Sequence, residues 1–163
     1  MKIKTASKVD LEQIVAIYNQ AIRNRQTGDI TEITASDRDR WFDDHDNEKF
    51  PIFVGEYEDR IVAWLSMSRY RPGREAFRNV AEISYYVDEN RIGQGFGTKI
   101  VEHALNYLES TSINVLIAII LGSNTESIEF IRKFGFEEWG RFPRIAEIDG
   151  KRFDHVFMGR RIK

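Results

Sequence analysis

The chain has 163 residues, of which 42% are hydrophobic and 31% charged, and a net charge of −2, which is the composition of one soluble globular domain, residues 1–163. The absence of a basic excess argues against a nucleic-acid partner, and the absence of cysteine excludes disulfides, thiolate metal sites and a cysteine nucleophile. The longest apolar run is too short to cross a bilayer and no signal-peptide core is present, so we expect a cytoplasmic protein without a membrane partner.

The spacing of the apolar residues predicts helices and strands in a definite order. The S-x-x-E pattern of Ser123 and Glu126 predicts a helix start, and the pair Asp149-Gly150 is typical of a hairpin turn. This order predicts an α/β (α+β) fold, with a mixed sheet and helices on both faces. The elements are a strand (3–7), two helices (11–22 and from 35), three strands (52–57, 61–68 and 79–87), a helix (96–108), a strand (115–121), a helix (124–134) and two strands within residues 136–159.

Three alternating glycines, Gly93, Gly95 and Gly97, stand where the strand at residues 79–87 leads into the helix at residues 96–108. Glycine is unfavourable in a helix, so its repetition indicates a need for bare backbone, and the free N–H groups of a helix N-terminus attract anions. The spacing matches neither the dinucleotide fingerprint G-x-G-x-x-G nor the phosphate loop G-x-x-x-x-G-K-[ST]. A site for the pyrophosphate of coenzyme A and a glycine-rich turn without a ligand remain as interpretations.

The same loop resembles the signature Q/R-x-x-G-x-G/A of the GCN5-related N-acetyltransferase (GNAT) superfamily, with Ile92 in place of Q/R. The segment "SNTESIEFIRKFGF" resembles the next helix of that superfamily, and Asn124 matches the asparagine that contacts the pantetheine arm of coenzyme A. The segment "GREAFRNVAEISYYVDE" is similar to one branch, the phosphinothricin and methionine sulfoximine acetyltransferases. The resemblance covers nearly the whole chain.

This resemblance implies a GNAT fold, whose mostly antiparallel sheet is splayed between the fourth and fifth strands. It implies an N-acetyltransferase that uses acetyl-CoA and no metal, acts on a small amino-acid-like amine of the phosphinothricin or methionine sulfoximine type, and forms a homodimer. Backbone N–H groups at residues 85–87 are expected to polarise the thioester carbonyl. The residues expected to bind acetyl-CoA are Tyr85, Tyr86, Val87, Gly93, Gln94, Gly95, Phe96, Gly97, Thr98, Asn124 and Ser127.

Three further residues are candidates for the acceptor side of the site. Glu82 lies among apolar and aromatic residues of its strand, which raises the pKa of a carboxyl group and suits a general base; the alternative is an ion pair with Arg74 or Arg78. Arg74 is a candidate for binding the carboxylate of an amino acid, or else a solvated loop arginine. Phe77 either forms a wall of the acceptor pocket or packs in the core.

One departure from the superfamily concerns the leaving group. Ile131 stands where many members carry a tyrosine that acts as general acid, which leaves open how the departing thiolate is protonated. A direct attack of the amine on acetyl-CoA is expected, because a chain without cysteine cannot form an acetyl-cysteine. Two other functions stay open: a protein or peptide N-terminal acetyltransferase, and a non-catalytic module that binds acetyl-CoA.

Overall fold

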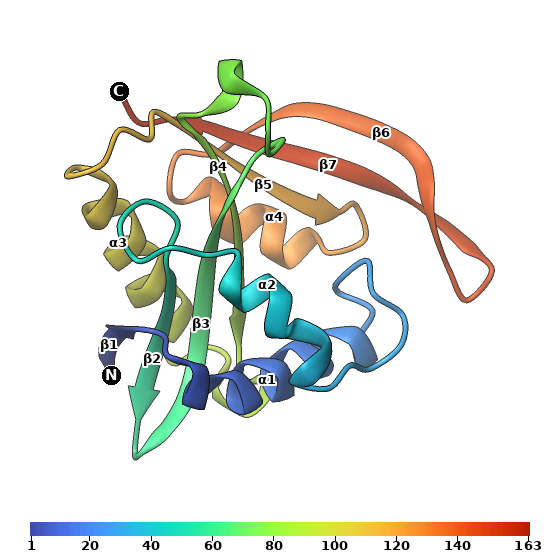
Figure 1. Ribbon diagram of the computed structural model, residues 1–163. Helices are drawn as coiled ribbons and strands as arrows, with labels where there is room; N and C mark the ends of the chain where they lie inside the picture. The colour runs from blue at the N-terminus through green and yellow to red at the C-terminus, as the bar shows by residue number, and fades with distance from the viewer.

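One sheet of seven strands runs through the computed structural model, which describes residues 1–163 (Figure 1). The strands are β1 Lys2–Thr5, β2 Ile52–Tyr57, β3 Arg60–Arg69, β4 Val80–Val87, β5 Val115–Leu121, β6 Glu137–Ile148 and β7 Lys151–Arg161. Their order in the sheet is β1-β2-β3-β4-β5-β7-β6. Only β4 and β5 run parallel, and every other neighbouring pair is antiparallel. The predicted mixed and mostly antiparallel sheet is confirmed.

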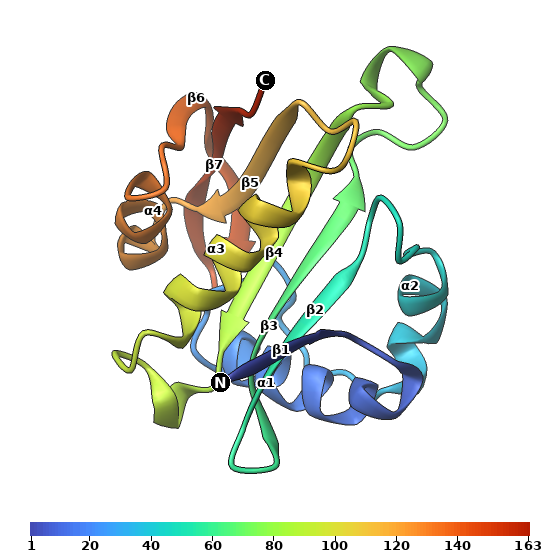
Figure 2. The same cartoon turned by 90° about the vertical axis from the view of Figure 1, so that its left-hand side faces the viewer.

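Helices cover both faces of this sheet, as predicted (Figure 2). They are α1 Leu11–Arg23, α2 Asp39–Asp43, α3 Phe96–Leu108 and α4 Thr125–Arg132. Successive strand residues point to opposite faces, so Leu65 packs in the larger core with α3 and α4 while Trp64 packs in the smaller core with α1. No helix is both long enough and apolar enough to cross a membrane.

The parallel strands β4 and β5 separate partway along their length. They pair only at Val80–Glu82, where Glu82 lies opposite Ile117. Beyond this point β4 continues to pair with β3 as far as Val87, and β5 continues to pair with β7 as far as Leu121. Each strand therefore keeps one neighbour and loses the other, which confirms the predicted splay and opens a gap in the middle of the sheet.

The last two strands, β6 and β7, form a long hairpin that extends past the rest of the sheet (Figure 1). Its turn is the predicted Asp149-Gly150 pair, and both residues have positive φ, as the tight hairpin turn requires. Asp149 also accepts two hydrogen bonds, of 2.7 and 3.2 Å, from the guanidinium of Arg25, in the loop that follows α1. The hairpin thereby fixes this loop beside the gap between β4 and β5.

Candidate active site

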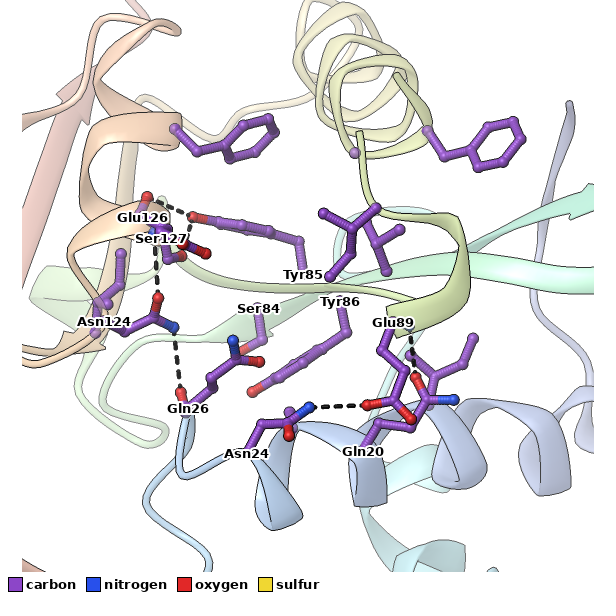
Figure 3. A pocket seen from close by; sticks show the side chains of 18 of the residues that line it. Gln20, Asn24, Gln26, Ser84, Tyr85, Tyr86, Glu89, Asn124, Glu126 and Ser127 are labelled. Atoms are coloured by element: carbon purple, nitrogen blue, oxygen red, sulfur yellow. Dashed lines mark hydrogen bonds between the residues drawn. The ribbon is translucent and has the colours of Figure 1, made fainter. Parts of the chain in front are cut away.

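A cavity of about 410 Å³ lies beside the diverging ends of β4 and β5 (Figure 3). Its walls come from α1 and the loop after it, the end of β4, the glycine-rich loop, β5 and the first turns of α4. Gln94 does not line it, whereas all the other residues predicted to bind acetyl-CoA do. These are Tyr85, Tyr86, Val87, Gly93, Gly95, Phe96, Gly97, Thr98, Asn124 and Ser127.

The glycine-rich loop offers free backbone N–H groups to this cavity. The N–H of Lys99 donates to the carbonyl of Gly95 over 3.1 Å, whereas those of residues 96–98 have no acceptor in the chain. Gly95 has a φ of +79°, which a residue with a side chain rarely adopts, and a Cβ on Gly97 would lie 3.3 Å from the ring of Phe130. Free N–H groups at the positive end of a helix form a binding site for an anion.

The edge of β4 that faces the gap offers further free N–H groups. The N–H of Asp88 donates to the carbonyl of Val62 beside β3, and N–H groups alternate between the two sides of a strand. The N–H of Tyr86 therefore points toward β3, and those of Tyr85 and Val87 point toward the gap, where β5 has diverged. Two of the three predicted polarising positions thus face the cavity with unpaired backbone donors.

The first turn of α4 is held by Asn124, not by Ser123 as predicted from the S-x-x-E pattern. Asn124 is the N-cap residue, and its Oδ1 accepts a hydrogen bond of 3.2 Å from the backbone N–H of Ser127. The amide has the better geometry because it is one residue closer to the helix, while its Nδ2 still lies 3.5 Å from the carbonyl of Gln26 across the cavity. The hydroxyl of Tyr85 lies 2.6 Å from Oγ of Ser127, and burial raises the pKa of Tyr85 to about 12 (Figure 3).

A second, smaller cavity of about 200 Å³ contains Glu82. It shares two wall residues, Ser84 and Tyr86, with the larger cavity, so the two cavities adjoin the same part of β4. Glu82 and Arg38 are the only charged residues in its walls. The remaining wall residues are Ile14, Val15, Tyr18, Trp41, Trp64, Ser66 and Ser68.

The carboxyl group of Glu82 is partly buried and forms no ion pair or hydrogen bond within the chain. The alternative in which it pairs with Arg74 or Arg78 is therefore wrong, since Arg78 lies 3.6 Å from Glu75 instead and Arg74 has no acidic partner. Burial raises the pKa of Glu82 above its usual value of 4.5, because charge is disfavoured away from water. An uncompensated carboxyl in the wall of the smaller cavity is a group able to accept a proton there.

Arg74 and Phe77 lie away from both cavities. They belong to the exposed loop between β3 and β4, and Phe77, which is 40% exposed, packs edge-on against Tyr70. The core alternative for Phe77 is therefore wrong. Neither residue touches Glu82 or lines the space around it in a single chain.

The sequence analysis missed the contribution of α1 and of the segments that follow it. Gln20 and Asn24 line the larger cavity, and both bond to Glu89 beyond the end of β4, with Nδ2 of Asn24 2.9 Å from its carboxylate (Figure 3). Gln20, which is partly buried, and Asn24, which follows the last residue of α1, are polar residues four apart at the end of an amphipathic helix, and this spacing is a usable signal for such a site. Arg38, by contrast, directly precedes a helix of only five residues and carries no pattern of its own.

Comparison with known proteins places this geometry in a family. Residues 3–157 match the sequence model of the acetyltransferase (GNAT) domain. A Bacillus subtilis (strain 168) protein named "Putative phosphinothricin acetyltransferase YwnH" is 41% identical in an alignment 164 positions long that covers 99% of each chain. An L-methionine sulfoximine/L-methionine sulfone acetyltransferase of Pseudomonas aeruginosa is 30% identical over 158 residues, which are 96% of this chain and 91% of the relative.

A solved structure carries the ligand that the larger cavity suggests. The GNAT superfamily phosphinothricin acetyltransferase of Sinorhizobium meliloti, crystallised with acetyl-CoA, aligns with a TM-score of 0.90 and 25% identity. The alignment covers 98% of this chain and 87% of that chain. The family match over nearly the whole length, the relatives at 30% identity or more and the splayed sheet agree. This chain belongs to the GNAT acetyltransferase family and is an N-acetyltransferase.

Proposed function

We propose that this enzyme transfers the acetyl group of acetyl-CoA directly to the amino group of a small amino-acid-like acceptor, of the phosphinothricin or methionine sulfoximine type. The observation that carries the proposal is the pair of cavities that share Ser84 and Tyr86 as wall residues, one lined by free backbone donors and the other by Glu82. The relatives at 30% and 41% identity, named for such substrates, support the choice of acceptor.

The larger cavity is the proposed donor site. The free N–H groups of residues 96–98 suit the pyrophosphate of coenzyme A, because a helix N-terminus stabilises negative charge. The gap-facing N–H groups of Tyr85 and Val87 suit the pantetheine arm and the thioester carbonyl. Bound there, acetyl-CoA would supply an activated acetyl group with a thiolate as leaving group.

The smaller cavity is the proposed acceptor site, with Glu82 as general base. An amino group is mostly protonated at neutral pH and must lose a proton before it can attack a carbonyl carbon. The raised pKa of Glu82 brings its basicity closer to that of the amine, which favours proton transfer. No cysteine is present to form an acetyl-cysteine, and direct transfer is the simplest route.

Protonation of the leaving thiolate does not come from residue 131 in this chain. Ile131 is fully buried in the core on α4, and its aliphatic side chain carries no proton to donate. A thiol has a pKa near 8.5, and its anion therefore leaves at neutral pH without a large penalty. We propose that the thiolate departs as the anion or takes a proton from water.

The test is the release of coenzyme A from acetyl-CoA, followed with a thiol reagent, across methionine sulfoximine, phosphinothricin, the common amino acids, polyamines and short peptides. The enzyme has no cysteine, so it adds no background to the signal. Release with the glutamine analogues and not with peptides is expected. Release with peptides alone would replace the proposal by protein N-terminal acetylation, and binding of acetyl-CoA without release would indicate a non-catalytic module.

A further inference from the structure

The cavity around Glu82 pairs one anion with one cation. Its two charged wall residues are Glu82, on β4, and Arg38, just before α2, and its other walls are aromatic, aliphatic and serine side chains. An amino acid at neutral pH also carries one cation and one anion, an ammonium and a carboxylate that are bonded to the same carbon atom. The cavity therefore presents the complement of a zwitterion, with Glu82 as the partner of the amino group and Arg38 as the partner of the carboxylate.

Arg38 is held in place by Asp29, which lies outside the cavity, and by two aromatic residues of the cavity wall, Tyr18 and Trp41. Its Nη2 donates to Oδ2 of Asp29 over 2.9 Å, and the same oxygen accepts a hydrogen bond of 2.6 Å from the hydroxyl of Tyr18. The guanidinium carbon also lies 4.7 Å from the ring centre of Tyr18 and 5.6 Å from that of Trp41. These contacts fix the plane of the guanidinium while using one of its five N–H donors.

A second unused donor belongs to a wall residue of the same cavity. Trp64 is 3% exposed and lines the cavity, and its indole N–H is the one buried side-chain polar atom of the chain without a hydrogen-bond partner. A buried N–H without a partner is unfavourable unless a ligand or water supplies an acceptor. Free guanidinium N–H groups and a free indole N–H together favour a ligand that brings oxygen acceptors.

We infer that Arg38 binds the carboxylate of the acceptor and selects amino acids over simple amines, while Asp29 and Tyr18 position it. This inference rests on the proposed function of the Glu82 cavity. It assigns to Arg38 the role that the sequence suggested for Arg74, which lies outside this cavity. A planar guanidinium suits a carboxylate because it donates two parallel hydrogen bonds.

The test compares Arg38→Gln with the wild type on two acceptors, methionine sulfoximine and the amine that remains when its carboxylate is removed. A charge-assisted pair of hydrogen bonds predicts a rise in KM for the amino acid of roughly 10- to 100-fold in the variant. KM for the decarboxylated amine should change less than threefold, because it lacks the group that Arg38 binds. Arg38→Lys keeps the charge but loses the planar fork, so its KM for the amino acid should lie between the values of the wild type and of Arg38→Gln.

Two controls separate this role from others. Arg40→Gln makes the same change on an exposed residue of α2 that forms no ion pair, and both KM values should stay at the wild-type level. Arg74→Gln should leave the ratio between the two acceptors unchanged. Equal losses on both acceptors in Arg38→Gln, or an acceptor-selective loss only in Arg74→Gln, would overturn the inference. A wild type without turnover on any amine would instead overturn the proposed function.

Discussion

At the scale of single residues, Glu82 places the needs of stability and of catalysis in opposition. Its carboxyl group is partly buried without a partner, which raises its pKa and so disfavours the charged form that a general base needs. The folded protein holds this proton more tightly than the unfolded chain does. Stability therefore falls as the pH rises from the ordinary pKa of glutamate through the raised value in the folded state.

We predict that Glu82→Gln lowers kcat by roughly 100- to 10,000-fold at neutral pH and raises the melting temperature there. The neutral amide keeps the shape of the side chain and removes the unfavourable charge, and the gain in stability should vanish below pH 4.5, the ordinary pKa of this side chain. Steady-state rates and melting curves between pH 4 and pH 9 are the measurement. Glu102→Gln, at an exposed position of α3, should change neither. A variant that is less stable at neutral pH would contradict the account.

Glu82 could be named as a candidate general base from the sequence, because a single acidic residue in an apolar strand stands out in the residue pattern. It did not predict Arg38, because one arginine near a short helix looks like any solvated cation until the fold brings it to the wall of a cavity. Arg74 illustrates the reverse case. Its place in a family motif suggested a role beside Glu82, and in this chain the loop between β3 and β4 carries it away from the cavity.

At the scale of elements, periodicity predicted every strand and all four helices, and hairpin turns followed from Asp149-Gly150 and from the break after Tyr57. Helix starts were less predictable. Ser123 and Glu126 have the spacing of a capping box, but the chain enters α4 so that the side chain of Asn124 reaches the N–H of Ser127. Competition between neighbouring cap residues depends on the incoming backbone direction, which the packing of β5 sets.

We predict that Asn124→Ala lowers the free energy of unfolding by about 1 kcal/mol without ligand, because the first turn of α4 loses its side-chain cap. Ser123→Ala, one residue earlier, should change it by less than about 0.5 kcal/mol, since Ser123 makes no side-chain hydrogen bond to the helix. Urea unfolding of the two variants beside the wild type is the measurement. A larger loss of stability in Ser123→Ala than in Asn124→Ala would show instead that Ser123 caps the helix.

At the scale of the whole molecule, the two halves of the sheet meet at a joint of three residue pairs, between Val80–Glu82 and Val115–Ile117. Resemblance to a family predicted this splay, and composition and periodicity alone did not, because an apolar strand such as β5 looks the same whether or not its neighbour is bonded to it. The larger cavity exists because the joint is short.

We predict an alternating pattern of amide hydrogen exchange along β4. The amides of Tyr85 and Val87 face the gap and should exchange faster than those of Ser84 and Tyr86, which face β3. Saturating acetyl-CoA should slow exchange at Tyr85 and Val87 and leave the other two amides unchanged. Exchange read residue by residue, by NMR with and without the ligand, decides this. Equal protection of all four amides in the free enzyme would contradict the geometry.

Because β4 and β5 pair over only three residues, the continuity of the sheet beside the cavity depends on what is bound there. The half with β1 to β4 and the half with β5 to β7 each keep their own ladder, but in the region of the cavity no backbone bond ties one half to the other. A ligand that forms hydrogen bonds to the edges of both β4 and β5 would replace the missing bonds between the strands. The two halves of the sheet would then be joined through the bound ligand. The substrate of such an enzyme is then also a transient part of its architecture, present for each turnover and lost at its end.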